Sequence, residues 1–183
     1  MDFAPLIQTP FWYLRHGETD WNAQGVSQGS VDIPLNPTGI AQAKDAAQQL
    51  RNRGIRTIVA SPLSRARVTA EIVAEVLDLP VRIDPDLREV SWGVQEGQPM
   101  ADWFHAWIIG GPAPAGGETF AELRHRATAG VNRALVEPAP VLLVAHGALF
   151  RAIRAAMGIE PDRRTKNGVP MWCAPGEGGW TID

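Results

Sequence analysis

Two histidines follow short apolar segments of the sequence, and their placement is typical of a catalytic centre. His16 comes soon after the segment 11–14, and His146 comes directly after the segment 141–145. Both segments are typical of buried strands, and ligands of open α/β sheets bind beyond the carboxyl ends of such strands. We therefore expect the two imidazole rings to share one site. A neutral imidazole is a nucleophile near pH 7, because its ordinary pKa of ~6.5 leaves one ring nitrogen unprotonated.

Two arginines accompany these histidines. Arg15 stands next to the first histidine, and Arg65 follows a third apolar segment, Thr57–Ala60, by way of Ser61 and Pro62. A capping serine and a proline at the first helical position predict that a helix begins here, with the arginine in its first turn. Guanidinium groups bind phosphate oxygens in pairs and stay charged at any relevant pH, and the first turn of a helix also favours anions. The two arginines therefore predict an anion site, typically for phosphate.

A metal centre is the competing interpretation of paired histidines, and their spacing disfavours it. The sequence has no His-x-x-x-His pair and no carboxylate–histidine spacing typical of a metal site. Cys173 is the single cysteine, so it forms neither an internal disulfide nor a pair of thiol ligands, and we expect it to be a packing residue. We expect no metal and no cofactor.

Several short motifs follow one another along the chain. They are Arg15–Asn22, Gln28-Gly29 with Asp32–Leu35, Ser61–Ala66 with Thr69-Ala70, Leu87–Glu89 with Gly93 and Glu96-Gly97, Gly117–Phe120, and His146-Gly147. In order and spacing this set, which covers roughly residues 11–157, resembles the histidine phosphatase superfamily, in the branch related to cofactor-dependent phosphoglycerate mutases and small-molecule phosphatases. The resemblance implies a single-domain α/β fold, a three-layer α/β/α sandwich with a mostly parallel sheet, like phosphoglycerate mutase.

The resemblance also implies roles for individual residues. His16 would carry a covalent phosphohistidine, and Glu89 would protonate the leaving alkoxide and later activate water, provided that its surroundings keep it protonated. Glu96 lies close by in the sequence, so its assignment as the acid in place of Glu89 stays open. The residues that would stabilise charge on the phosphate are Arg15, Arg65 and His146. Further contacts to phosphate or substrate would come from Asn22, Gln28, Gly29 and Gly147.

These roles predict a metal-independent phosphatase that hydrolyses small-molecule phosphomonoesters. A phosphoglycerate-type mutase is one alternative, but it needs further cationic contacts for a second phosphate, and the segment 96–118 contains no Arg or Lys. A catalytically silent module that recognises phosphate is the other alternative, and recognition alone does not require a nucleophile and an acid together. The sequence does not name the phosphate ester, because specificity depends on the cap and the tail.

Composition is consistent with an ordinary globular domain. The chain has 183 residues, 45% hydrophobic and 20% charged, with a formal net charge of −3. The charge provides no basic surface of the kind that binds nucleic acid, so we expect no nucleic-acid partner. The N-terminal residues lack a leader pattern and no segment is long and apolar enough to span a membrane, so we expect a cytoplasmic protein without a membrane partner. The oligomeric state, including a homodimer, stays open.

The rest of the chain must supply the elements that position the site. Residues 17–36 are expected to be a loop, and 170–173 and 179–182 two short edge strands. The expected strands of the main sheet are 11–14, 57–60, 81–83 and 141–145. The expected helices are about 37–53, 63–77, 119–135 with a capping box, and 149–157.

A cap-like insertion at about 97–118 is expected within a single domain, 1–183. Trp103, Phe104, Trp107 and Ile108 have the spacing of a helix-packing stripe, so packing is the default interpretation. The alternative is an aromatic wall at the substrate mouth, which would favour a substrate with an apolar part. The two remaining histidines, His105 and His125, fit no motif and are expected to be surface or cap residues.

Overall fold

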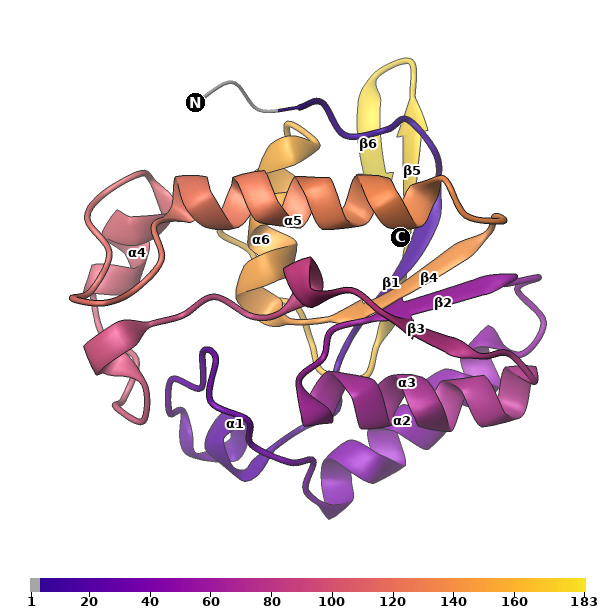
Figure 1. The fold of residues 1–183 in the computed structure, drawn as a ribbon, viewed down its shortest axis with the longest axis horizontal. Coiled ribbons are helices and arrows are strands. Elements are labelled where there is room, and N and C mark those ends of the chain that lie inside the picture. The colour runs from indigo at the N-terminus through magenta and orange to yellow at the C-terminus, as the bar shows by residue number, and fades with distance from the viewer. Residues whose placement is uncertain (1–3) are drawn as a thin grey trace.

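The computed structural model describes residues 4–183, and within them the chain forms one α/β domain around a six-stranded sheet (Figure 1). The order of the strands is β3-β2-β4-β1-β5-β6. The parallel strands are β1 (Phe11–Arg15), β2 (Thr57–Ala60), β3 (Val81–Ile83) and β4 (Val141–Ala145). The antiparallel strands are β5 (Pro170–Gly176) and β6 (Gly179–Ile182). The prediction of a mostly parallel sheet is confirmed. The expectation that the chain has no leader rests partly on residues 1–3, which lie outside the described residues.

Helices cover both faces of the sheet and make three layers. α2 (Pro37–Leu50) and α3 (Ser64–Leu77) lie on one face, and α5 (Phe120–Leu135) and α6 (Gly147–Ala156) lie on the other (Figure 1). The central strand β4 is apolar throughout, because both of its faces are buried. Its side chains alternate: Leu142 and Val144 pack with α2 and α3, whereas the intervening residues pack with α5 and α6. The three-layer α/β/α prediction is therefore confirmed.

Local signals explain several helix ends. Asn36 Oδ1 accepts a hydrogen bond from Gly39 N (2.8 Å) at the start of α2, and Pro37 occupies its first position. Thr119 and Glu122 form the expected capping box at the start of α5. α2 ends at Leu50 rather than at about residue 53, where the sequence places its end.

Two predicted helix starts are wrong. α3 begins at Ser64 with Leu63 as its N-cap, so Ser61 is not the capping residue; its hydroxyl lies against His146 instead. α6 begins at Gly147 directly after β4, two residues earlier than expected. The predicted loop 17–36 also contains a short helix, α1 (Asp20–Gln24), which begins with a capping box.

The segment between β3 and α5 contains short turns and one short helix. Two 3-10 turns, Pro85–Leu87 and Gly93–Gln95, precede α4 (Trp103–Ile108). The ring of Trp107 is fully buried and packs at 4.6 Å from Trp92 and 5.0 Å from Phe120, measured between centroids. This confirms the packing interpretation for Trp107, whereas Phe104 of the same stripe also lines a pocket.

Candidate active site

The ends of β1 and β4 bring His16 and His146 together. The two strands are paired in parallel, with Arg15 opposite Ala145, and His16 N donates to Ala145 O (3.0 Å). The two imidazole rings lie 5.2 Å apart between centroids. The expected convergence of these histidines is therefore present in the structure.

The hydrogen bonds of His16 determine which ring nitrogen is available. Its Nδ1 lies 2.6 Å from the Gly17 carbonyl oxygen, which can only accept, so Nδ1 carries the ring proton. Burial, followed by the charges of Arg65 and Arg15, lowers the pKa of His16 well below its ordinary value, although the bond to Gly17 opposes this. The neutral ring therefore keeps a lone pair on Nε2.

Tight packing fixes the main chain around His16. Gly17 lies so close to Gly39 that an added Cβ would be 2.2 Å from the Gly39 oxygen, which excludes any larger residue without a shift of the backbone. Gly17 N donates to Thr69 Oγ1 (3.1 Å), and Asn167 Nδ2 donates to His16 O (2.9 Å). The carbonyl that orients the imidazole is therefore held in place by three other segments of the chain.

His146 is fully buried and is held at both its main chain and its ring. Tyr13 Oη donates to His146 O (2.8 Å) and accepts from His146 N (3.1 Å). The ring Nε2 lies 2.6 Å from Ser61 Oγ, whereas Nδ1 is buried without a hydrogen-bond partner among residues 4–183. Burial first, and then the charge of Arg65, lowers its pKa well below the ordinary value. The ring is neutral and one of its nitrogens is unsatisfied.

Arg15 and Arg65 are both ordered by backbone carbonyls. Arg15 Nη1 donates to Thr165 O (2.6 Å), and Arg65 donates from Nη1 to Val31 O and from Nη2 to Gly29 O, both at 2.7 Å. The Nε atoms of both arginines are buried without a partner in the described chain. Burial lowers the pKa of Arg15 to about 10, so it keeps its charge at neutral pH. Unsatisfied donors on two fixed guanidinium groups fit an anion.

Glu89 lies in the segment between β3 and α4, and its carboxylate faces the first turn of α6. Its Oε1 accepts from Val90 N (3.0 Å) and Leu149 N (2.9 Å), and its Oε2 accepts from Ala148 N (3.0 Å). Each carboxylate oxygen has two acceptor positions, so these bonds fill Oε1 and leave one position on Oε2. Oε2 is therefore the oxygen that can carry or accept a proton.

Glu96 has a different environment. Its Oε1 accepts from Ser30 N, Ser30 Oγ and Trp92 N at 2.8, 2.7 and 3.2 Å, and the residue does not line the pocket that Glu89 lines. These bonds tie the loop of residues 28–31, whose carbonyls orient Arg65, to the segment after Glu89. The contacts of Glu96 therefore hold this loop in place, outside the pocket that Glu89 lines.

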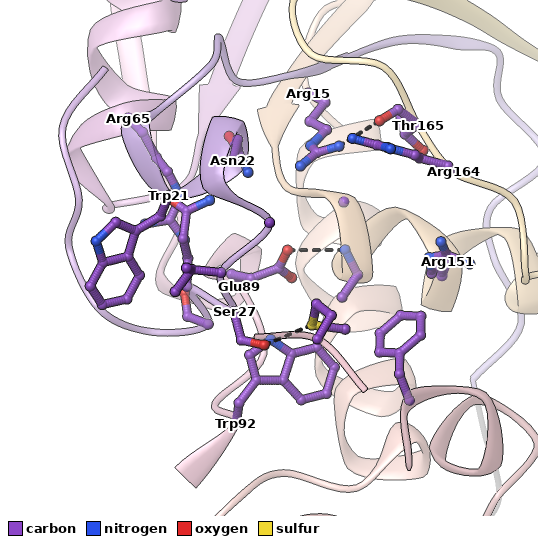
Figure 2. A pocket seen from close by; sticks show the side chains of 18 residues that line it. Arg15, Trp21, Asn22, Ser27, Arg65, Glu89, Trp92, Arg151, Arg164 and Thr165 are labelled. Carbon is purple, nitrogen blue, oxygen red and sulfur yellow. Dashed lines mark hydrogen bonds between the residues drawn. The ribbon is translucent and has the colours of Figure 1, made fainter. Parts of the chain in front are cut away.

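A pocket of about 410 Å³ opens above these groups (Figure 2). It is lined by the predicted site residues Arg15, Asn22, Gln28, Gly29, Arg65, Glu89 and Gly147. His16 and His146 are not among the lining residues; they lie buried next to Arg15 and Arg65. Asn22 and Gln28 also hold the loop, since Asn22 Oδ1 accepts from Thr19 N and Gln28 Oε1 accepts from Thr19 Oγ1.

Sequence reasoning missed other residues that line this pocket. Arg151 comes from α6, and Arg164 and Thr165 come from the loop that follows it. Trp21, Trp92 and Phe104 add aromatic surface, and Met100 adds a thioether. The pairing of Arg15 with Thr165 could not be seen from motif spacing, because 150 residues separate the two. The segment 96–118 contains no Arg or Lys, and the cationic side chains that line the pocket come from other parts of the chain.

A buried ion pair supports the segment that carries Glu89. Arg126 donates from Nε to Glu118 Oε1 (2.8 Å) and from Nη2 to Glu118 Oε2 (2.6 Å). The same guanidinium donates to the carbonyls of Asp86 (2.9 Å) and Arg88 (2.7 Å). Arg126 of α5 therefore connects the segment before Glu89, at Asp86 and Arg88, with Glu118 in the segment that follows it.

The described residues also limit other kinds of site. No group of three His, Cys, Asp or Glu side chains within residues 4–183 is arranged to hold a metal ion. Over the same residues, none of the helices has the length and apolar character needed to cross a bilayer.

Fold and site together define an α/β protein with paired histidines and paired arginines gathered at one edge of the sheet. The chain belongs to the histidine phosphatase superfamily (branch 1), whose family model matches residues 11–174.

Similar proteins include phosphatases and probable mutases. The chain is 41% identical over 143 residues to the uncharacterized phosphatase PhoE of Bacillus subtilis (strain 168), covering 76% of this chain and 72% of that protein. It is 39% identical over 168 residues to the probable phosphoglycerate mutase GpmB of Yersinia enterocolitica, covering 84% and 78%. The solved mycobacterial glucosyl-3-phosphoglycerate phosphatase, in complex with VO3, superimposes with a TM-score of 0.84 at 32% identity, covering 95% of this chain and 97% of that one.

Proposed function

We propose that this protein is a metal-independent phosphatase that hydrolyses small-molecule phosphomonoesters through a phosphohistidine on His16. The observation that carries the proposal is the hydrogen bond from His16 Nδ1 to the Gly17 carbonyl, which leaves the lone pair on Nε2. The lowered pKa of the ring keeps that lone pair free at neutral pH. A buried, oriented and unprotonated imidazole is what nucleophilic attack on phosphorus requires.

The first half of the reaction forms the covalent intermediate. His16 Nε2 attacks phosphorus in line, a P–N bond forms, and the P–O bond to the leaving group breaks. Glu89 gives its proton from Oε2 to the departing alkoxide, since Oε1 is already filled by two backbone donors. Arg15 and Arg65 stabilise the charge on the equatorial oxygens, which is the work that a metal ion performs in other phosphatases.

His146 completes the anion site. If the Ser61 hydroxyl donates to Nε2, the ring proton resides on Nδ1, the buried nitrogen that has no partner among residues 4–183. We propose that this N–H donates to the transferring phosphoryl group. Ser61, which the sequence assigned to a helix cap, is then a positioning residue for His146.

The second half of the reaction regenerates the enzyme. Glu89 Oε2, now unprotonated, takes a proton from water, the oxygen attacks phosphorus, and the P–N bond breaks. Inorganic phosphate leaves and His16 is neutral again. We assign the acid and base role to Glu89 and not to Glu96, whose Oε1 is engaged by Ser30 and Trp92 away from the pocket.

Substrate enters, on this proposal, past a cap formed by the segment 97–118, from which Met100 and Phe104 reach the pocket. The mycobacterial relative was solved with VO3, an oxyanion that mimics phosphate, and its name describes a phosphomonoester with a sugar and a glycerate part. Both facts are consistent with hydrolysis of a small metabolite phosphate here.

A mutase is the second candidate, because similar proteins bear the name probable phosphoglycerate mutase. A mutase would return the phosphoryl group from His16 to a second hydroxyl of the substrate, so free phosphate would not accumulate. A phosphatase passes it to water.

The test is phosphate release from a panel of metabolite phosphates by the purified chain in the presence of a chelator. The proposal predicts release of free phosphate, loss of release in His16→Ala, and normal release in His125→Ala, which changes an exposed histidine away from the pocket. Activity that disappears with chelator and returns with a stoichiometric divalent ion would contradict metal independence. Interconversion of phosphoglycerates without release of phosphate would favour the mutase.

A further inference from the structure

Two arginines that the phosphoryl-transfer steps do not use line the same pocket as Arg15 and Arg65. Arg151 lies on α6, and Arg164 lies in the loop between α6 and β5. In the view of Figure 2 both are drawn on the side of Glu89 opposite Arg65. Arg15 is drawn on that side as well, close to Arg164 and Thr165, so the reacting phosphate is expected between Arg65 and Arg15, with Arg164 beside it.

Arg164 has no compensating charge of its own. Within residues 4–183 it forms no ion pair with a carboxylate and no side-chain hydrogen bond. It is adjacent to Thr165, whose carbonyl accepts from Arg15 Nη1. The positive charge of Arg164 also contributes to lowering the pKa of Arg15, after the larger effect of burial, so the two guanidinium groups are close enough to repel each other.

Arg151 is held at the pocket wall by two contacts. Its Nη1 is paired with Asp162 Oδ1, and its Cζ lies 5.0 Å from the ring centroid of Phe104 in α4. Only 13% of its side chain is exposed. Asp162 also lies 3.0 Å from His105 Nδ1, so this carboxylate is shared between α4 and α6. The guanidinium is therefore positioned, and not a freely moving surface charge.

The balance of charge in the pocket leaves a cation without a partner. Of the carboxylates in the described chain, Glu89 alone lines the pocket, against four arginines. A phosphomonoester dianion offsets Arg15 and Arg65, and Asp162 offsets Arg151. Glu89 adds no negative charge when substrate binds, because the proposed first step requires it to be protonated. Arg164 then remains an uncompensated, exposed cation at the pocket wall, beside the phosphate site that Arg15 helps to form.

We propose that Arg164, with Arg151 beside it, forms a subsite for a second anionic group of the substrate. The preferred substrates are then phosphomonoesters that also carry a carboxylate or a second phosphate. This inference rests on the proposed phosphatase function and specifies its substrate class.

The experiment uses three glycerol-based esters that differ only at the end remote from the reacting phosphate: glycerol 3-phosphate, 3-phosphoglycerate and glycerol 1,3-bisphosphate. Their distal groups are a neutral alcohol, a carboxylate and a phosphate. We expect the wild-type chain to prefer one or both of the anionic esters, as measured by kcat/KM. Arg164→Ala should reduce that preference about ten- to hundredfold, the range for a lost charge-assisted hydrogen bond.

Arg163→Ala is the matched control. Arg163 is the neighbouring exposed arginine of the same loop, and it lines an adjacent pocket but not this one. The control should leave the preference unchanged, and Arg164→Lys should retain part of it because the charge remains. The relative size of the effect on the two anionic esters identifies which group the subsite takes.

The subsite is refuted if Arg164→Ala changes kcat/KM equally for all three esters, or if the wild-type chain does not favour an anionic distal group. Hydrolysis of para-nitrophenyl phosphate, which has no second anionic group, is followed in parallel. If this hydrolysis is lost in His16→Ala, the proposed phosphatase function is supported independently of the subsite. If that activity is absent along with all others, the phosphatase proposal fails; if it is present while the preference is absent, only the subsite fails.

Discussion

The pair formed by Arg126 and Glu118 offers a quantitative test of how the acid is positioned. Both side chains are nearly buried, with 9% and 15% exposed, and the pair is bidentate at 2.8 and 2.6 Å. Arg126→Met keeps much of the aliphatic stem, but it removes the pair and leaves the Glu118 carboxylate buried without its cation. Breaking such a pair costs about 3–5 kcal/mol. The carbonyls of Asp86 and Arg88 lose their donor as well, so the segment before Glu89 loosens.

The assay is chemical denaturation followed by tryptophan fluorescence, combined with kcat/KM for an alkyl phosphate. Arg126→Met should lower the free energy of unfolding by several kcal/mol and also lower kcat/KM. Adding Glu118→Gln to Arg126→Met should recover part of the stability, because no unpaired charge is then buried. Arg67→Met is the control, since its ion pair with Glu71 is about half exposed on both sides and should contribute no more than about 0.5 kcal/mol.

The reasoning would be refuted by a cost below about 1 kcal/mol for Arg126→Met. It would also be refuted if the effects of Arg126→Met and Glu118→Gln were simply additive, because the two groups would then not be coupled.

Three further predictions concern the reacting groups. Glu89→Gln should slow alkyl phosphates about 10²–10⁴-fold and activated aryl phosphates far less, since a phenoxide leaves without a proton, whereas Glu96→Gln should affect both alike. Ser61→Ala should lower kcat roughly five- to tenfold by releasing the His146 ring, and Ser61→Thr, which keeps the hydroxyl, should restore part of it. Folding stability should fall as the pH falls below ~6.5, because His16 and His146 take up protons in the unfolded chain but resist them in the folded one, by at most about 1.4 kcal/mol per pH unit for each histidine.

Each of these has a clear contrary result. Equal losses on alkyl and aryl esters in Glu89→Gln would remove Glu89 from the role of proton donor, and a leaving-group dependence in Glu96→Gln would transfer that role. An unchanged kcat in Ser61→Ala would show that the serine does not position His146. A free energy of unfolding that stays constant from about pH 7.5 to about pH 5.5, measured by denaturation, would mean that the two imidazoles are not protected from protonation.

Much of the framework could be predicted because its signals are local. The strands β1 and β4 are short, mostly apolar segments followed directly by His16 and His146, and β2 is followed by the helix that carries Arg65 in its first turn. Parallel strands align their carboxyl ends, so the meeting of His16, Arg65 and His146 follows from the order of the elements. The capping box of α5 and the Asn-Pro start of α2 act within four residues, which is why these two helix starts could be predicted.

What could not be predicted depends on contacts between distant segments. α3 begins at Ser64 because Asp32 Oδ1 accepts from both Ser64 N and Ser64 Oγ at 2.7 Å, so the acceptor at this helix start comes from 32 positions away. Ser61 is thereby free to contact His146. Arg151 and Arg164 reach the pocket only because the loop after α6 folds back over Arg15 and α4 packs on α6. Neither contact leaves a pattern in the local sequence.

Trapping of the phosphoryl group on the enzyme tests the central claim most directly. The purified chain is mixed rapidly with a phosphate-labelled substrate and quenched in base, because a P–N bond is lost in acid, and the labelled residue is then identified by peptide mapping. The account predicts label on His16 at no more than one phosphate per chain, its decay at the rate of turnover, and no label in His16→Ala. Label on another residue, or full turnover by His16→Ala, would contradict it.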